Sequence, residues 1–388
     1  MGYLYWIAGT ILGLAWFSRI VDAALGVPKV ADISRPQWDL QPRIHARVSI
    51  IVPACNEEET IEQGLSLLLS LDYDNYEVIV VDDRSTDRTG EIIETVAASP
   101  EAHGCLKVIH VSELPPGWLG KTHAMWTAGG QATGDWFLFT DADVLFKPDV
   151  LRRALVYAEA ENADHVVVFP RMIMKRPGER MMIAFFQTLF TFGHRPWKVA
   201  DPKTKDHMGV GAFNMVRRNA YQAVGTYKAL RMEVLDDMKL GKVIKNARFA
   251  QRNVFGDDLI SIRWANGAMG VVNNLTKNFF AVLSFQWWRT VASAFGLLFL
   301  NLGPFIGVWL AHGWARVPYA VALGSMFLIY LGMSFKSSIP SYYFFLHPVS
   351  TMLFEYTLLR SMFLTLWDDG VTWRGTKYPL EELRKGLV

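Results

Sequence analysis

The order of apolar and polar residues divides the chain into three parts, and the first part is a single apolar run. Residues 3–20 carry no charge before Arg19 and are long enough to span a bilayer as one helix. Small residues at 22–24 would also suit a cleaved signal peptide. No basic residue precedes the apolar run, so we expect an uncleaved transmembrane anchor over residues 1–25.

The middle part alternates short apolar runs with amphipathic stretches, after a linker at residues 26–47. The apolar runs predict strands at 48–53, 77–82, 106–111, 136–140 and 165–169, and helical patterns fill 57–71 and 87–98. Strands that read as continuous apolar runs and alternate with helices predict a mostly parallel sheet covered on both faces. The expected fold class is therefore α/β, with one domain over residues 48–268.

Long apolar segments dominate the last third. Residues 290–336 predict a transmembrane hairpin, and an interfacial segment at 269–289 precedes it. A further apolar stretch at 342–367 is ambiguous because it contains Glu355 and Arg360, which are costly in the middle of a bilayer. We favour an interfacial or re-entrant helix and a cytoplasmic tail within residues 337–388.

Composition supports a membrane protein and excludes other classes. Apolar residues make up 51% of the 388 residues and charged residues 20%, and the mean hydropathy is +0.16. A net charge of +2 gives no argument for nucleic acid binding, and two cysteines exclude a disulfide framework. Basic residues after the first segment (Arg19, Lys29 and Arg35) predict a cytoplasmic middle part by the positive-inside rule.

Polar clusters follow three of the predicted strands: Asn56–Glu57, Asp82–Asp83 and Asp141-Ala-Asp143. Ligands of parallel sheets bind at the carboxyl ends of the strands, so these clusters mark the expected site. Residues 85–87 would cap the following helix in any case, but capping does not explain the two acids before them. Two carboxylates spaced like Asp141 and Asp143 can share a divalent cation with a diphosphate.

Two further motifs carry candidate chemistry. Three acids at residues 233–237 open a helical pattern, where the helix dipole favours them, and one of them could act as a general base. Gly120-Lys121-Thr122 is not a complete nucleotide triphosphate-binding loop because Pro115 replaces the glycine that such a loop requires. Lys121 could nevertheless reach a phosphate group.

An almost wholly apolar stretch, residues 181–192, lies inside the otherwise soluble domain. A helix that is apolar all round is usually buried in a core. It could instead be an interfacial helix on the path of a lipid, with Trp197 and neighbouring cations at headgroup level.

Together these motifs resemble a family 2 glycosyltransferase with a GT-A, Rossmann-like catalytic domain. The resemblance covers residues 48–263 and rests on the first strand and its turn, on Asp82–Asp83, on the Gly-Lys, D-x-D and Asp236–Asp237 motifs, and on Gly209-Val-Gly-Ala-Phe213. The C-terminal Trp373-Arg-Gly-Thr-Lys-Tyr378 resembles an element of bacterial hopanoid-associated and carotenoid-type enzymes. Ceramide glucosyltransferase-like lipid glycosyltransferases are similar in organisation.

The resemblance implies roles for particular residues. Asp83 would hold the nucleotide base in a pocket lined by Pro53, Ala54 and Glu57. Lys121 would neutralise part of the diphosphate. Asp141 would face the ribose or the metal ion, and Asp143 would bind that ion, Mg²⁺ or Mn²⁺. Asp237, next to Asp236, would be the base. The acceptor side would include Gly211, Ala212 and a Q-x-x-R-W-like element, for which Gln286 with Arg289 and Arg263 with Trp264 are two incomplete candidates.

The implied protein is an inverting enzyme of the inner membrane with a cytoplasmic catalytic domain. It would transfer a sugar from a nucleotide-sugar donor, expected to be a UDP-sugar, to a hydroxyl group of a membrane lipid. Alternatives are a polysaccharide-type or polyprenyl-phosphate sugar transferase of the same family and an inactive membrane binding protein. A sugar nucleotidyltransferase fits poorly, because the turn after the first strand is not the Gly-rich turn of that class.

Overall fold

The computed structural model describes residues 2–102, 104–337 and 339–388, and the chain divides into two compact units. Residues 30–173, 198–263 and 372–388 form a sheet unit, and residues 1–29, 174–197 and 264–371 form a helical unit. Each unit is therefore built from three segments of the chain, and segments of the two units alternate along the sequence.

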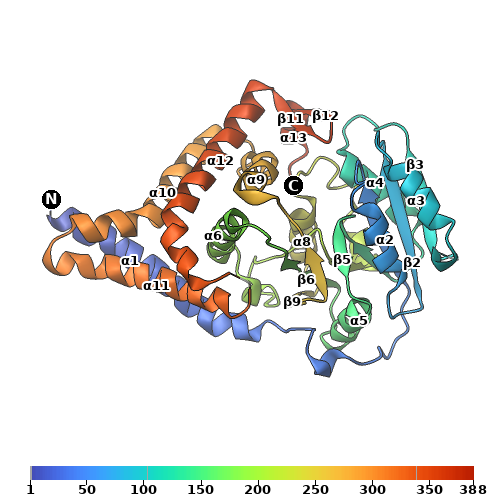
Figure 1. Cartoon of the computed structure of the whole chain (residues 1–388), viewed down its shortest axis with the longest axis horizontal. Helices are drawn as coiled ribbons and strands as arrows, with labels where there is room; N and C mark the ends of the chain where they lie inside the picture. The colour runs from blue at the N-terminus through green and yellow to red at the C-terminus, as the bar shows by residue number, and fades with distance from the viewer. Residues whose placement is uncertain (1, 103, 338) are drawn as a thin grey trace. The chain divides into compact units, whose positions relative to one another are not determined.

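A seven-stranded sheet in the order β3-β2-β1-β4-β8-β6-β9 is the centre of the sheet unit (Figure 1). Its strands are β1 Val48–Ala54, β2 Tyr76–Asp83, β3 Leu106–Val111, β4 Trp136–Phe139, β6 His165–Phe169, β8 Asn214–Arg217 and β9 Gln251–Phe255. Neighbouring strands are parallel except that β8 runs antiparallel to β4 and β6. A smaller sheet contains β5 Val144–Phe146, β7 Arg171–Met172 and β10 Ile260–Ile262. The prediction of a mostly parallel sheet is confirmed.

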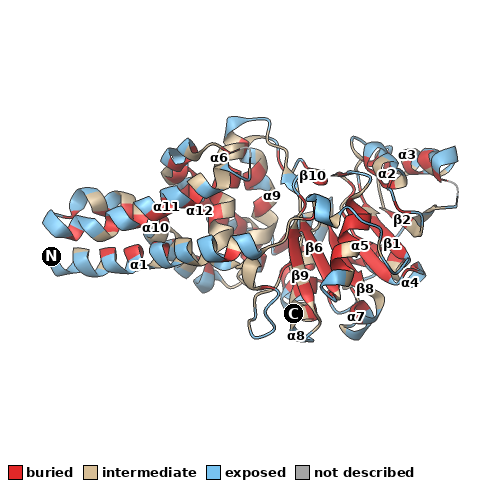
Figure 2. Ribbon diagram, turned by 90° about the horizontal axis from the view of Figure 1, so that it is seen from below, coloured by how far each residue is buried: buried red, intermediate tan, exposed pale blue. Residues whose placement is uncertain are grey.

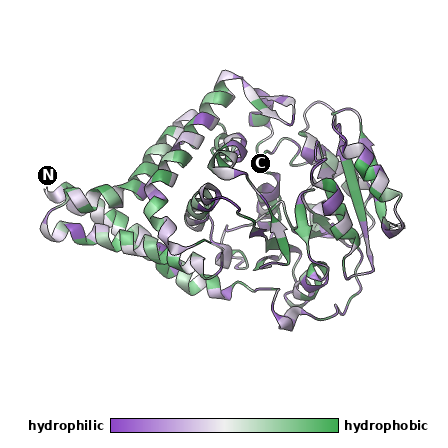
Figure 3. Cartoon of the chain, in the orientation of Figure 1, coloured by the Kyte–Doolittle hydropathy of each residue, from purple (hydrophilic) through white to green (hydrophobic). Residues whose placement is uncertain are grey.

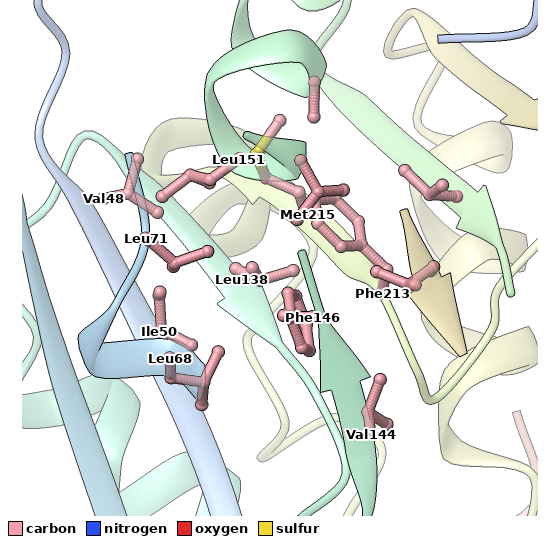
Figure 4. Packing of buried hydrophobic residues seen from close by; sticks show 14 of the residues in the cluster. Val48, Ile50, Leu68, Leu71, Leu138, Val144, Phe146, Leu151, Phe213 and Met215 are labelled. Carbon is pink, nitrogen blue, oxygen red and sulfur yellow. The ribbon is translucent and has the colours of Figure 1, made fainter. Parts of the chain in front are cut away.

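Helices cover both faces of the large sheet. Successive side chains of each strand point to opposite faces, so each strand contributes to two cores. Val48, Ile50 and Val52 of β1 pack in one core with α2 (Ile61–Leu69), α3 (Thr89–Ala97) and α5 (Val150–Ala160). Figure 4 shows part of this core, including Val48, Ile50 and Leu151. Ile51 packs in the opposite core with α4 (Gly120–Gln131), α7 (Arg218–Ala223) and α8 (Asp236–Asn246). Two buried faces explain why these strands read as unbroken apolar runs.

The helical unit contains α1 Gly2–Gly26, α6 Pro177–Gly193, α9 Gly267–Val282, α10 Trp287–Leu310, α11 Val317–Ser334 and α12 His347–Trp367. The imidazole of His347 is fully buried at its centre, 3.0 Å from the hydroxyl of Tyr330 and 3.1 Å from the side-chain oxygen of Asn301. These contacts satisfy both ring nitrogens and hold α12 against α10 and α11.

Three helical segments among the described residues are long and apolar enough to cross a membrane: Gly2–Lys29, Trp287–Leu310 and Gly313–Ser334. They coincide with the predicted anchor and hairpin. Much of their surface is exposed and apolar (Figures 2 and 3). Trp309 and Trp314, near the turn between α10 and α11, are about four-fifths exposed, as suits aromatic side chains at headgroup level. Helix α12 is not one of these three segments.

One face of helix α6 is buried, which favours the core alternative over the interfacial alternative for residues 181–192. All of these residues are described and none is exposed. Phe185 is fully buried, with its ring centroid 4.7 Å from that of Phe354. The helix belongs to the helical unit although the sequence placed it in the 48–268 domain. Its buried face is formed by Met182, Ile183, Ala184, Phe185 and Thr188, and the other residues of this stretch are partly exposed.

Replacing Phe185 with serine should therefore destabilise the helical unit by about 3–5 kcal/mol, since the substitution removes a buried aromatic ring and buries a hydroxyl group. Thermal unfolding in detergent will measure the loss as a lower melting temperature. The same substitution at Phe363, whose side chain is 58% exposed, is the control and should cost much less. Equal melting temperatures for the two variants would contradict the assignment of α6 to the core.

Candidate active site

The predicted polar clusters meet at the carboxyl ends of three adjacent strands. Asn56 and Glu57 follow β1, Asp83 ends β2, and Asp141 and Asp143 follow β4. Strands β2, β1 and β4 are neighbours in the sheet. Pro53 and Ala54 are the last two residues of β1, so the predicted nucleotide-binding residues gather at one edge of the sheet.

Side-chain hydrogen bonds connect the loops that follow β1 and β2. The side-chain oxygen of Asn56 accepts the backbone N–H of Thr86 at 2.8 Å, and the hydroxyl of Ser85 accepts the backbone N–H of Asn56 at 3.1 Å. Asp87 also accepts the backbone N–H of Glu58 at 3.2 Å. The polar residues at 85–87 therefore fix the β1 loop as well as the approach to α3.

The two adjacent acids at the end of β2 have separate tasks. Asp82 accepts the backbone N–H of Ser85 at 3.3 Å and contacts His110 at 3.0 Å, so it is structural. Asp83 is 4% exposed and receives two hydrogen bonds from the guanidinium of Arg84, at 2.8 and 2.9 Å. A Cβ atom on Gly120 would lie 2.2 Å from the Asp83 carboxylate, so the close approach of α4 requires glycine.

Lys121 carries the positive charge at the centre of the site. Its ammonium lies 2.7 Å from a carboxylate oxygen of Asp141 and 3.6 Å from one of Asp236, and its side chain is 20% exposed. Burial alone would lower the pKa of Lys121, but the carboxylates of Asp141 and Asp236 raise it. The lysine therefore stays charged.

A small pocket surrounds this cluster and contains both acids of the Asp236–Asp237 pair. Its lining is Lys121, Met125, Phe139, Thr140, Asp141, Gly211, Asn214, Tyr227, Asp236 and Asp237. Asp236 and Asp237 begin α8, and Gly211 comes from the loop before β8. Positive and negative side chains thus converge from three segments of the sheet unit: α4, the segment after β4 and the start of α8.

Asp237 is held by backbone groups. One carboxylate oxygen accepts the N–H of Gly211 at 2.9 Å, and the other accepts the N–H of Met238 at 2.7 Å. Burial raises the pKa of Asp237, while Lys121 opposes the shift. The neighbouring Ala212 is buried, and its carbonyl accepts the hydroxyl of Thr140 at 2.8 Å. The loop before β8 therefore orients the candidate base.

A buried polar network that the sequence did not reveal supports the backbone of Asp237. The amide oxygen of Gln251 accepts the N–H of Met208 at 2.9 Å, so its nitrogen faces His165 Nδ1 at 2.7 Å. His165 Nδ1 is therefore an acceptor, and Nε2 donates to the side-chain oxygen of Asn214. The Asn214 amide nitrogen then donates to the Asp237 carbonyl at 3.4 Å.

The pair Asp141 and Asp143 has the chemistry of a partial site for a divalent cation. Burial, with help from the Asp141 carboxylate, raises the pKa of Asp143 to about 6. A positive charge close to Asp141 and Asp143 would reduce the repulsion between the two carboxylates. Among the described residues no group of three or more His, Cys, Asp and Glu side chains could hold a metal alone. Two carboxylates completed by diphosphate oxygens and water fit Mg²⁺ or Mn²⁺.

The residues predicted on the acceptor side are divided between the two units. Arg263 follows β10 and ends a segment of the sheet unit. Trp264 belongs to the helical unit, with its ring centroid 5.1 Å from that of Phe186. Gln286 precedes α10, and exposed Arg289 lies over the ring of Trp288 in the first turn. Neither candidate for the Q-x-x-R-W element is thereby preferred.

Part of the chain is similar to proteins of a known family. Residues 49–225 match the family model described as glycosyl transferase family 2. The chain is 24% identical over 236 residues to 4,4'-diaponeurosporenoate glycosyltransferase of Staphylococcus haemolyticus, covering 60% of each protein. It is 33% identical over 158 residues to beta-monoglucosyldiacylglycerol synthase of Synechocystis, which is 39% of this chain and 32% of that relative. The chain thus spans less than two thirds of either relative.

A solved structure confirms the fold. A mannosyltransferase from Pyrobaculum calidifontis, in complex with GDP-Man and Mn²⁺, superposes with a TM-score of 0.56 at 20% sequence identity. The superposition covers 94% of this chain and 99% of that one. The predicted fold class, a GT-A-like domain with a mostly parallel sheet, is therefore confirmed.

The buried histidine of the network makes the sheet unit sensitive to acid. Burial lowers the pKa of His165 to about 4 from the ordinary 6.5. Between these values the unfolded chain binds protons more strongly, so stability present above about pH 6.5 is lost as the pH falls toward about 4. The loss should be about 3 kcal/mol.

Melting temperatures between about pH 7 and pH 4 will measure this loss, and His165→Gln should flatten their dependence on pH. His45→Gln, at a partly exposed surface position, is the control and should follow the wild type. An unchanged slope for His165→Gln would contradict the neutral, buried state of His165.

Proposed function

We propose that the chain transfers a sugar from a nucleoside-diphosphate sugar to a membrane lipid hydroxyl, because its residues 49–225 match the family model described as glycosyl transferase family 2. The observation that carries the proposal is the Lys121 cluster, in which one ammonium lies 2.7 Å from Asp141 and 3.6 Å from Asp236 beside Asp237. This arrangement combines positive charge for a diphosphate with a carboxylate that can remove a proton.

On the donor side, Asp83 and the residues that follow β1 would bind the nucleotide, which we expect to be UDP. Lys121 would contact the diphosphate and stabilise the negative charge that develops as the sugar leaves. Asp141 and Asp143 would hold Mg²⁺ or Mn²⁺, which supplies further positive charge to the leaving group. The carboxylates that flank Lys121 keep it protonated for this role.

On the acceptor side, Asp237 would take the proton of the attacking hydroxyl. Its raised pKa makes it a stronger base than an ordinary aspartate, and its two backbone hydrogen bonds fix the direction of its oxygens. A single displacement of this kind inverts the anomeric centre. A polyprenyl phosphate acceptor is already an anion and needs no base, so the buried Asp237 favours a hydroxyl acceptor.

The apolar helices support a lipid as the acceptor. Three segments among the described residues could cross a membrane by length and composition. With the anchor and the hairpin in the inner membrane and the sheet unit in the cytoplasm, a lipid would meet the donor at the membrane surface. The relatives named for a carotenoid acid and for a glucosyldiacylglycerol are consistent with this proposal.

The base assignment predicts different effects for the two acids of α8. Asp237→Asn should reduce turnover by about 10²–10⁴-fold while nucleotide binding changes little, because the amide cannot accept the proton. Asp236→Asn removes a partner of Lys121 but leaves the proposed base in place, so it should reduce turnover much less. Steady-state transfer and calorimetric titration with UDP separate these effects. An active Asp237→Asn variant alongside an inactive Asp236→Asn variant would refute the assignment.

The cation site predicts metal dependence. Asp143→Ala should abolish transfer and weaken UDP binding in the presence of Mg²⁺ or Mn²⁺, because one of two carboxylate ligands is lost. Asp74→Ala, at a side chain that is 87% exposed, is the matched control and should behave as the wild type. Full activity of the wild type in excess EDTA would contradict the proposed metal site.

A further inference from the structure

A two-stranded hairpin near the C-terminus, which belongs to the sheet unit from Thr372 onward, has an arginine at its tip. Strands β11 (Gly370–Trp373) and β12 (Thr376–Pro379) are joined by Arg374 and Gly375, whose φ angles are +48° and +77°. Positive φ at both central residues is the type I′ turn, in which Asn-Gly is strongly preferred. Arginine is conformationally strained at the first position, and strained residues cluster at functional sites.

The second strand of the hairpin is anchored on the nucleotide side of the candidate site. The hydroxyl of buried Tyr378 accepts the backbone N–H of Gly120 at 3.1 Å, and the hydroxyl of Thr376 accepts a guanidinium N–H of Arg84 at 3.1 Å. Gly120 precedes Lys121, and Arg84 binds Asp83. The hairpin is therefore in direct contact with the segments that carry two predicted donor-binding residues.

The tip of the hairpin lies at the end of β1. The guanidinium of Arg374 forms an ion pair with Glu57 and donates a hydrogen bond to the carbonyl of Cys55. Burial alone would lower the pKa of Arg374, but the carboxylate of Glu57, with a smaller contribution from Asp141, raises it. Arg374 thus belongs to the same electrostatic cluster as the D-x-D motif, although more than 200 residues separate them in the sequence.

The chemistry of this cluster is suited to a diphosphate. Without a donor, the cations of the site are engaged by acids: Lys121 by Asp141 and Asp236, Arg84 by Asp83, and Arg374 by Glu57. The side chain of Arg374 is 41% exposed, so a ligand can reach it. A guanidinium forms two parallel hydrogen bonds to phosphate oxygens, which a single ammonium such as that of Lys121 cannot do.

We propose that Arg374 binds the diphosphate of the nucleotide sugar and that the β11–β12 hairpin forms a wall of the donor pocket. This inference rests on the proposed function and deepens it by assigning a donor-binding residue outside residues 49–225. The strained turn presents the guanidinium at the end of β1, and the contacts of Thr376 and Tyr378 fix the hairpin in that position. A merely structural Arg374 would hold the hairpin to Glu57 without contacting the donor.

The Arg374→Asn substitution separates these two roles. Asn-Gly is the preferred sequence for a type I′ turn, so the hairpin should stay folded while the guanidinium is lost. Purified variants in detergent with Mn²⁺ are titrated with UDP and, separately, with uridine, which has the base and ribose but no diphosphate. Lys377→Asn, an exposed substitution on the same hairpin that also removes one positive charge, is the matched control.

We expect Arg374→Asn to weaken UDP binding by about 10–100-fold and leave uridine binding within about twofold of the wild type, as loss of a charged hydrogen-bond pair predicts. Lys377→Asn should bind both as the wild type does. Arg374→Lys should be intermediate for UDP, because it keeps the charge and loses the fork.

Equal weakening of UDP and uridine, or unchanged UDP binding by Arg374→Asn, would overturn the inference and leave the proposed function standing. A wild-type protein that binds neither UDP nor GDP would overturn the proposed function as well. The melting temperature of Arg374→Asn should not fall below that of Arg374→Lys, and a large selective fall would assign Arg374 to a structural role.

Discussion

The charge of Lys121 is the interaction on which the geometry of the candidate site depends. Its largely buried ammonium must be neutralised within the protein, because an unpaired buried charge is strongly destabilising. Asp141, after β4, and Asp236, at the start of α8, supply the neutralising carboxylates. The sheet edge, α4 and α8 are thereby held around one pocket. The same charge is available to a diphosphate. One ammonium group would therefore both stabilise the fold and bind the donor.

Around this charge, backbone groups and buried amides fix the positions of the acids. Gly211 both donates its N–H to Asp237 and leaves room for Asp141, whose carboxylate would lie 2.5 Å from a Cβ atom at that position. Behind them, His165, Asn214 and Gln251 connect three strands to the carbonyl of Asp237. The orientation of the candidate base therefore depends on residues from β6, β8 and β9 that contact no substrate.

Local patterns in the sequence predicted the sheet and the acids at its edge, because each strand and its following turn lie within a few residues. The ends of β1, β2 and β4, and the pairing of Asp141 with Asp143, are of this kind. The buried role of Phe185 was not predicted uniquely, because an apolar helix suits both a core and a membrane surface. The contacts of Gln251 with His165 and of Arg374 with Glu57 join residues far apart in the chain, and periodicity does not reveal such pairs. A clue to the latter was the Trp373–Tyr378 element, which resembles a lipid glycosyltransferase motif yet has no local structural explanation.

The most direct test of the account is the chemical identity of the product. Purified protein in detergent is incubated with a bacterial lipid extract and a panel of radiolabelled UDP- and GDP-sugars, and the lipid-soluble label is then treated with mild acid. The account predicts that one sugar nucleotide labels a lipid class and that the label resists mild acid, as a glycoside of a hydroxyl group does. Label released completely by mild acid would identify a phosphate-linked sugar and contradict the hydroxyl acceptor. The absence of any labelled lipid, with every donor of the panel, would contradict the account as a whole.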